Sequence, residues 1–188
     1  IMSDMRFIAA GECEPAAILS RLNAGFTQRE GDTSFVTMLF MVLDPATGKL
    51  TVANAGHWPP LLRKGVKGVF KPMQMEDVGF AVGAVPEATY AQYDISLGAG
   101  DCLLAFTDGV TEAEGAEGRY FGSRRLQQCV NLPGATPDGL VQKVLSEVQS
   151  FCGQRAQSDD LTMLCLGVRQ GASGEQGTPT LTAPAATA

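Results

Sequence analysis

The chain lacks the patterns of several common protein classes. It contains no run of about 20 consecutive apolar residues, which a membrane-spanning helix needs, and no charged-then-apolar signal pattern at its start. Basic residues are outnumbered, with 14 Lys and Arg against 20 Asp and Glu, so the formal net charge is −6. Nucleic acids and anionic membranes are themselves negative, which disfavours both as non-specific partners. We therefore expect a cytoplasmic protein with a protein or small-molecule partner.

Familiar catalytic and metal-binding motifs are also missing. There is no G-x-G-x-x-G or G-x-x-x-x-G-K-S/T phosphate loop and no G-x-S-x-G nucleophile elbow. Five cysteines without C-x-x-C spacing disfavour structural zinc and disulfides. The single histidine, His57, is followed by the single tryptophan, Trp58. A lone histidine is more often structural than catalytic. A Ser/His/Asp triad stays open, because its members need not be close in sequence, but nothing else supports it.

Length and composition favour one domain. With 188 residues, of which 45% are hydrophobic, the chain can build one sizeable core. We place the domain at residues 1–169. Residues 170–188 are small, polar and nearly uncharged, which predicts a disordered tail. Ile1, Met5 and Ile8 recur at helical spacing, so we expect the chain to begin inside a helix.

The pattern of apolar residues predicts an α+β domain with mainly antiparallel strands. An amphipathic helix begins at Pro15, and a longer one begins at Thr136 as N-cap and ends at Gly153. A short helix is expected over 121–130. β-branched and apolar runs separated by turn residues predict the strands, including a hairpin around 44–48. The expected strands cover residues 35–43, 50–53, 60–64, 68–71, 90–97, 102–106 and 161–168.

Two acidic turns lie at the ends of buried-looking strands. Asp108 and Gly109, in the turn 106–109, follow the apolar run 102–105, and Asp159 precedes the run that begins near Leu161. Taken singly, such aspartates are usually turn formers that bond nearby backbone N–H groups. Carboxylates close to a core, however, need compensation, and a hard cation such as Mg²⁺ or Mn²⁺ prefers oxygen ligands. We therefore expect these two turns to share a divalent metal site.

Other charged residues have simpler interpretations. Glu112 and Glu114 are expected in the first turn of a helix, where acidic side chains stabilise the macrodipole. Arg124 and Arg125 are expected on a solvated helix face.

Eight segments stand out by their order along the chain: 35–39, 43–50, 53–60 with its A-N-A-G-H sequence, 79–85, 100–101, 106–113 with T-D-G-V-T-E-A, 121–122, and 159–162 with D-D-L-T. Together they resemble the SpoIIE/RsbU-like branch of the metal-dependent PPM-type serine/threonine protein phosphatases. The resemblance covers residues 1–168.

The resemblance implies a four-layer α-β-β-α sandwich of the PPM phosphatase type. It implies two Mn²⁺ or Mg²⁺ ions that activate a water to attack phosphoserine or phosphothreonine, so no protein side chain is the nucleophile. By position, Asp108 and Asp159 match metal ligands of the family. Asn54, Gly56, His57 and Gly109 match positions that shape the pocket.

This chain departs from the family at its start. The family's further acidic metal ligands, in a G-D-V-x-G segment, precede the first residue here, and N-terminal strands of one sheet would be missing too. We expect the C-terminal part of a larger phosphatase, with a sensor or receiver domain upstream and a phosphorylated anti-sigma-factor antagonist as substrate. The alternative is a catalytically incomplete module that acts by protein–protein binding, because two carboxylates bind metal less well than four.

Overall fold

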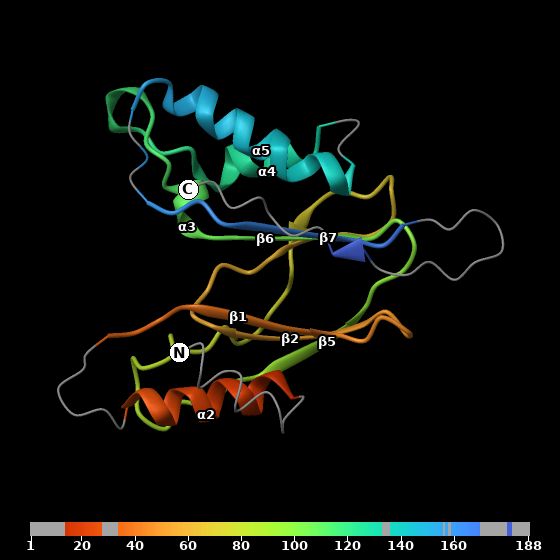
Figure 1. Ribbon diagram of the computed structural model, residues 1–188, viewed down its shortest axis with the longest axis vertical. Coiled ribbons are helices and arrows are strands. Elements are labelled where there is room, and N and C mark those ends of the chain that lie inside the picture. Colours follow the sequence, from red (N-terminus) through yellow and green to blue (C-terminus); the bar gives the residue numbers. More distant parts are fainter. Residues whose placement is uncertain are drawn as a thin grey trace. The chain divides into compact units, whose positions relative to one another are not determined.

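The computed structural model describes residues 14–27, 34–132, 136–155, 157, 159–169 and 180–181. The chain divides into two compact units, each with one antiparallel sheet and at least one helix of its own (Figure 1). The first unit consists of Ile1–Pro59 and Gln74–Ser96, and the second of Pro60–Met73 and Leu97–Ala188. The chain thus passes from the first unit to the second at Pro60, returns at Gln74, and then adds the last strand of the first sheet.

The first unit packs one helix on a three-stranded sheet. Helix α2 (Pro15–Thr27) lies against the sheet β1-β2-β5, formed by β1 (Met38–Leu43), β2 (Lys49–Ala55) and β5 (Gln92–Ser96). Proline suits the first position of α2, because its missing N–H has no partner there in any helix. The helix buries its apolar face against Ala53, Ala55 and Val82, through Ile18, Leu19, Leu22 and Phe26.

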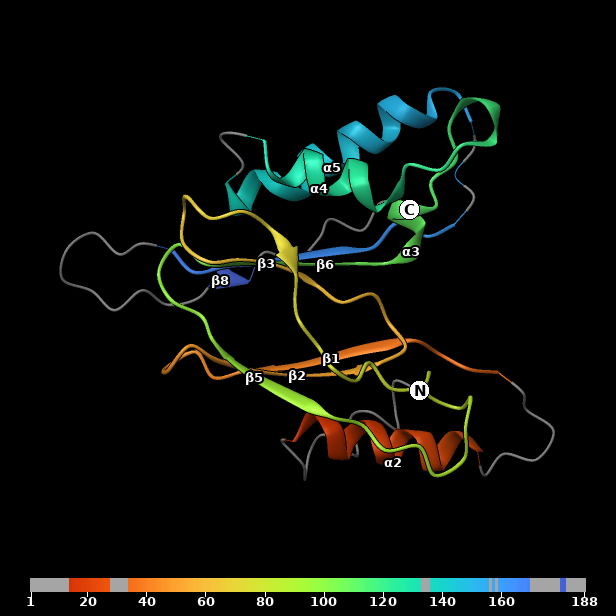
Figure 2. The ribbon, with the colours of Figure 1, turned by 180° about the vertical axis from the view of Figure 1, so that it is seen from behind.

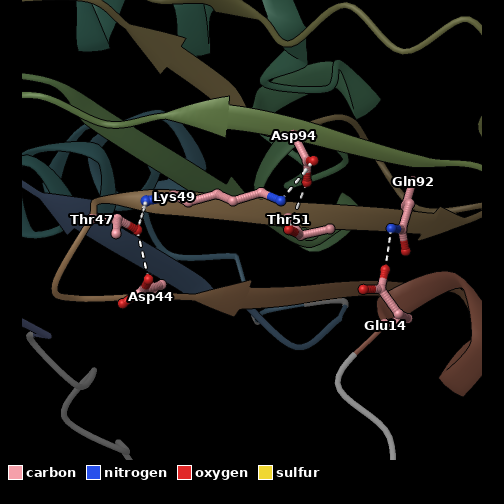
Figure 3. A network of polar contacts seen from close by, with 7 residues as sticks. All are labelled: Glu14, Asp44, Thr47, Lys49, Thr51, Gln92 and Asp94. Carbon is pink, nitrogen blue, oxygen red and sulfur yellow. Dashed lines mark hydrogen bonds and ion pairs between the residues drawn. The ribbon is translucent and has the colours of Figure 1, made fainter.

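The hairpin between β1 and β2 is closed by local polar contacts (Figure 3). Asp44 accepts hydrogen bonds from the amide of Ala46, at 2.9 Å, and from the hydroxyl of Thr47, at 2.6 Å. Gly48 follows with φ of 72°, a conformation that glycine adopts without strain. The predicted hairpin is therefore confirmed, and its register pairs Leu43 with Leu50.

Further polar contacts join α2 and β2 to β5. Lys49 lies 2.9 Å from Asp94, whose other oxygen accepts a 2.7 Å hydrogen bond from Thr51 (Figure 3). At the start of α2, Gln92 donates to Glu14 and accepts from the amide of Ala16 at 3.3 Å. The amide of Ala16 is one of the N–H groups that a helix start leaves without an intrahelical partner, so Gln92 satisfies it from β5.

The second unit packs helices on a five-stranded antiparallel sheet of order β4-β3-β6-β7-β8 (Figure 2). Helices α4 and α5 cover one face of this sheet, and their apolar side chains share one core with those of β6 and β7. The elements are β3 (Leu61–Arg63), β4 (Lys71–Pro72), β6 (Cys102–Phe106), α3 (Asp108–Thr111), the short 3-10 helix η1 (Ala116–Gly118), α4 (Gly122–Val130), α5 (Pro137–Cys152), β7 (Met163–Gly167) and β8 (Thr180–Leu181).

Helix α5 begins and ends at the predicted signals. The hydroxyl of Thr136 accepts from the amide of Gly139 at 3.2 Å, which makes Thr136 the N-cap, and Pro137 occupies the first turn. Gly153 ends the helix with φ of 63°. Leu140, Val144 and Val148 are buried, as their spacing predicts. Cys102, Cys129 and Cys165 are also buried in this core, where thiols pack as small hydrophobic groups.

Most predicted elements are confirmed, with differences at their ends. The predicted strand at 68–71 is wrong over most of its length, because only Lys71 of that range is in β4. The expected N-terminal helix around Ile1 lies outside the described residues. The disordered tail at 170–188 stays a prediction; within it, Thr180 and Leu181 pair with Gly167 and Leu166, and its other residues lie outside the described part. None of the described helices has the length and apolarity that crossing a bilayer requires.

Candidate functional site

The first acidic turn follows a fully buried strand. All five residues of β6 are buried, and Asp108 then begins the four-residue helix α3 with its side chain exposed. The carboxylate Oδ1 of Asp108 accepts a 3.0 Å hydrogen bond from the amide of Gly109. The carbonyl of Asp108 accepts from the hydroxyl of Thr111 at 3.1 Å and from the amide of Glu112 at 2.7 Å. Hydrogen bonds within its own turn therefore fix both the carboxylate and the backbone carbonyl of Asp108.

The second acidic turn precedes β7. Asp159 is exposed, and its Oδ1 accepts a 2.7 Å hydrogen bond from the amide of Asp160. Its carbonyl accepts from the side-chain amide of Gln157 at 2.7 Å. This geometry repeats that of Asp108, because in both turns the carboxylate accepts from the next residue's amide. The turn-former interpretation is therefore correct for each aspartate taken alone.

The structure brings these two turns together. Strands β6 and β7 are antiparallel neighbours, and Phe106 at the end of β6 pairs with Met163 at the start of β7. The backbones also touch beyond the strands, since a Cβ atom added to Gly109 would lie only 2.5 Å from the carbonyl oxygen of Asp160. Residues about 50 positions apart thus lie in adjoining turns. The two turns therefore adjoin at one end of β6 and β7, as a shared metal site would require, and the shared site itself stays a prediction.

One expectation about the carboxylates is wrong. We expected them close to the core, where an uncompensated charge is costly, but both Asp108 and Asp159 are exposed at the end of the sheet. Water can solvate them there. Support for a cation site therefore comes from the adjacency of two oxygen donors and not from burial.

The donor set fits a hard divalent cation in type and not in number. Among the described residues, no hydrogen bond or ion pair involves Oδ2 of Asp108 or of Asp159. Carboxylate oxygens suit Mg²⁺ and Mn²⁺, which keep several waters when few carboxylates hold them. No group of three or more His, Cys, Asp or Glu side chains gathers within the described ranges. Two carboxylates alone are a weak site.

Aromatic and charged side chains support the segment after α3. The rings of Phe121 and Phe151 meet edge to face, with centroids 5.6 Å apart. The guanidinium of Arg125 lies 4.7 Å from the centre of the Phe151 ring. The solvated-face prediction for Arg125 is therefore incomplete, because its exposed side chain also covers an aromatic ring.

The helix-dipole interpretation of Glu112 and Glu114 is wrong. Glu112 is the C-cap of α3 and lies at the end where acidic charge is unfavourable. Glu114 follows the helix and forms an ion pair with Arg155, just beyond α5. The sequence pattern could not distinguish the two ends of so short a helix.

The Asn54 turn belongs to the first unit. Asn54, at 1% exposure, is buried near the end of β2, and it bonds both backbone groups of His57. Its Oδ1 accepts from the His57 amide at 2.8 Å, and its Nδ2 donates to the His57 carbonyl at 2.9 Å. Gly56 has φ of 70°, and a Cβ there would lie 3.0 Å from the amide nitrogen of Ala81. Asn54 and Gly56 thus fix the backbone at His57.

The side chain of His57 is half-buried. Its Nδ1 lies 3.2 Å from the hydroxyl of Thr37. Its role as a residue that shapes the pocket stays a prediction, as do the roles of Asn54, Gly56 and Gly109.

Sequence reasoning missed two residues that hold loops in place. Thr107 connects the two acidic turns by its hydroxyl. Asn23, buried on α2, accepts from the amide of Gly83 at 2.8 Å and donates to the carbonyl of Val85 at 2.9 Å. A polar residue on the apolar face of a predicted helix was a readable signal for Asn23. For Thr107 the signal was weaker, because threonine before an aspartate is common in turns.

Comparison with known proteins supports the resemblance inferred from the motifs. The family profile of stage II sporulation protein E (SpoIIE) matches residues 2–169. Protein IcfG of Synechocystis sp. is 28% identical over 134 residues, which cover 70% of this chain and 20% of that protein. The phosphoserine phosphatase RsbU of Bacillus subtilis is 30% identical over 104 residues, covering 55% of this chain and 30% of RsbU. The chain thus spans less than a third of either relative.

Solved structures show the same fold. The SiaA-PP2C domain of Pseudomonas aeruginosa matches with a TM-score of 0.68 and 20% identity, over 84% of this chain and 62% of that one. The phosphatase domain of SpoIIE from Bacillus subtilis matches with a TM-score of 0.62 and 15% identity, over 91% and 73%. At these identities the likeness concerns the fold, and it confirms the predicted fold class: a mixed helix and sheet structure of the PP2C type.

Proposed function

Because this chain belongs to the SpoIIE family of PP2C-type phosphatase domains, we propose that it hydrolyses phosphoserine or phosphothreonine on a regulatory protein. RsbU, one of its relatives, is named a phosphoserine phosphatase, which supports a phosphorylated side chain as substrate. The substrate that we propose is an anti-sigma-factor antagonist. The proposal includes a sensor or receiver domain elsewhere in the gene product, since the relatives are much longer than this chain.

The adjacency of the two acidic turns carries this proposal. Asp108 and Asp159 would hold Mn²⁺ or Mg²⁺, with their carboxylates at the exposed end of β6 and β7. When bound, such ions supply a water of lowered pKa and positive charge beside the phosphoryl oxygens. Exposure of the two carboxylates suits this role, because a phosphorylated side chain on another protein has to reach them.

The other candidate residues, in either unit, act by holding backbone. Gly109 permits the close approach of the two acidic turns, because any larger residue would place a Cβ against Asp160. Within the first unit Asn54 holds the backbone of His57, and we propose a shaping role for these two residues and not proton transfer. No protein nucleophile is required, which agrees with the lack of a nucleophile elbow in the sequence.

The test is release of phosphate from a phosphoserine protein by the full-length gene product with Mn²⁺. Asp108→Asn and Asp159→Asn each remove one charged ligand, so we expect each to lower kcat by at least about a hundredfold, the scale of a several-kcal/mol loss of charge stabilisation. Glu147→Gln, the same change on the exposed surface of α5, should leave the rate unchanged. Full activity in both aspartate variants would contradict the assigned roles.

A second candidate function is a phosphatase-like module that binds a regulatory protein without hydrolysis. The observation that favours it is the donor count, since the described part of the chain supplies two adjoining carboxylates and no larger group. Calorimetry with Mn²⁺ separates the two functions. Binding of two ions at micromolar concentration would exclude the module, whereas no binding to the full-length gene product would exclude the phosphatase.

A further inference from the structure

Thr107 forms hydrogen bonds to the opposite acidic turn through both its hydroxyl and its backbone amide. Its hydroxyl donates to the carbonyl of Asp160 at 2.9 Å and accepts from the amide of Thr162 at 3.0 Å. Its own amide donates to the carbonyl of Thr162 at 3.0 Å. The backbone bond continues the pairing of β6 with β7 to Thr162, and the hydroxyl bond to Asp160 extends beyond it toward Asp159. One side chain therefore spans the gap between the turns.

The hydroxyl of Thr107 bonds to residues that are distant in the sequence and not to its own helix. Thr107 is the N-cap of α3, with φ of −83° and ψ of 162°, and a threonine there usually accepts from the second or third amide of its own helix. In this structure its side chain makes no such capping bond. The hydroxyl instead bonds to Asp160 and Thr162. It therefore joins two turns and does not cap its own helix.

Both carboxylates lie within one residue of these contacts. Asp108 follows Thr107 directly, and Asp159 precedes Asp160, whose carbonyl accepts from the Thr107 hydroxyl. Each carboxylate is fixed in turn by the amide of the next residue, Gly109 or Asp160. The separation of the two carboxylates therefore depends on how the two backbones are joined, and Thr107 joins them.

We propose that Thr107 is a positioning residue for the divalent cation, which it never touches. This inference rests on the proposed function, because it assigns a role toward the cation that Asp108 and Asp159 would share. Ions of this kind require ligands at nearly fixed distances, Mg²⁺ most strictly. Groups that orient ligands from behind commonly change metal affinity by about 10- to 100-fold when they are removed. Loss of the Thr107 hydroxyl should thus weaken metal binding while both carboxylates remain.

Two substitutions separate the hydroxyl from the shape of the side chain. Thr107→Val keeps the branched shape and removes both hydroxyl bonds, and Thr107→Ser keeps the hydroxyl and removes a methyl group. Calorimetry with Mn²⁺ on the full-length protein, at a temperature where circular dichroism shows every variant folded, gives the affinities. We expect Thr107→Val to raise the Kd by at least about tenfold and Thr107→Ser to change it by less than about threefold.

A second measurement needs no metal and no activity. Hydrogen exchange of the Thr162 amide should become faster in Thr107→Val and stay slow in Thr107→Ser, because that amide donates to the hydroxyl. An unchanged Kd in Thr107→Val would overturn the inference, and so would equal losses in both variants or a wild-type protein that does not bind Mn²⁺. If Mn²⁺ binds and depends on the hydroxyl but no phosphate is released, the proposed function fails and the positioning role stands.

Discussion

The acidic turns and the Asn54 turn hold their backbones in different ways. At Asn54 a buried side chain reaches three residues along the chain and bonds both backbone groups of His57. At the acidic turns the carboxylates are exposed, and besides the local bonds of each turn, contacts of Thr107 and Gly109 with Asp160 join the two backbones. The first arrangement is local, and the second joins residues more than 50 positions apart.

The comparison shows that some side chains hold the backbone of a turn, whereas others present a charge to solvent. Asn54 is buried, and in the described part of the chain its side chain bonds to the backbone of His57 and to the sulfur of Met75, so it stabilises the shape of the turn. Asp108 and Asp159 are exposed at the ends of buried strands, so their charge is available to a ligand at little cost in desolvation. If this division holds, substitutions of holding residues should lower stability, and substitutions of the exposed carboxylates should chiefly lower metal binding.

Gly109→Ala should have the largest effect on stability. The added Cβ would lie 2.5 Å from the Asp160 carbonyl oxygen and 3.0 Å from its carbon, so the two backbones must separate. Overpacking of this kind costs about 2 to 3 kcal/mol. Urea denaturation measures the loss, and Mn²⁺ affinity should fall with it because the carboxylates move apart.

Gly98→Ala is the matched control for Gly109→Ala. It lies in the same unit, and the nearest atom to its added Cβ is 3.9 Å away, which is an ordinary contact. Its effect should stay within about 0.5 kcal/mol, as for most substitutions without a steric conflict. Equal losses at the two glycines would mean that the close approach at Gly109 does not limit stability.

Asn54→Ala should have the next largest effect, and it tests the local turn. The substitution removes the Asn54 side chain, which is the partner of the His57 amide and carbonyl and lies in a buried position. An unsatisfied buried polar group costs about 1 to 3 kcal/mol, so we expect a loss of about 2 kcal/mol in thermal or urea unfolding.

Thr37→Val is the control for Asn54→Ala. It removes the exposed hydroxyl beside His57 Nδ1 and leaves the backbone of the turn intact. A change within about 0.5 kcal/mol is expected. If Thr37→Val costs as much as Asn54→Ala, the turn depends on the histidine side chain and not on its backbone.

The sequence predicted most of the elements because each depends on local signals. Pro15, the Thr136 N-cap and Gly153 mark helix ends, and Asp44 with Gly48 marks the hairpin. Strand 68–71 was misplaced, because glycine and one aromatic residue in a short run say little about pairing. No local signal shows that β3 and β4 belong to the second unit and β5 to the first, since this depends on which distant segments pair.

For the candidate site, the sequence indicated two acidic turns that could act together, but it did not indicate their contacts. Asp108 and Asp159 were chosen as candidates because each stands at one end of an apolar run. Their exposure was not predicted, because an alternating or continuous apolar pattern shows which strands are buried and not where a turn projects. The hydrogen bonds of Thr107 to the other turn were also not predicted, since an N-cap threonine usually bonds within its own helix, and the pairing of β6 with β7 brings Asp160 and Thr162 to its hydroxyl instead.

Asp101 sharpens the comparison, because it is an aspartate that holds backbone. It is 5% exposed and accepts from the amides of Gly65, at 2.7 Å, and Gly98, at 2.9 Å, and it forms an ion pair with Lys64. Burial opposes ionisation of Asp101, but these hydrogen bonds and the charge of Lys64 outweigh it, and its pKa lies below the usual value. Asp101→Asn should cost about 1 kcal/mol at pH 7, since solvent screens the half-exposed lysine.

The pH dependence of this loss follows from the depressed pKa. A carboxyl whose folded-state pKa is lowered contributes fully above its unfolded pKa of about 4, and the contribution disappears as the pH falls through the folded value. The difference between wild type and Asp101→Asn should therefore be constant from about pH 5 to pH 8 and shrink below about pH 4. Urea denaturation at a series of pH values measures it.

Asp94→Asn is the control that separates burial from pairing. The pKa of Asp94 is also lowered, first by the hydrogen bond from Thr51 and then by Lys49, but its side chain is 53% exposed (Figure 3). Water replaces lost partners at an exposed carboxylate, so its substitution should cost less than that of Asp101 at every pH. If the two variants lose equal stability, the hydrogen-bond and ion-pair partners of an aspartate, and not its burial, determine its contribution to the free energy of unfolding. The contrast between buried holding residues and exposed presenting residues would then not extend to the carboxylates.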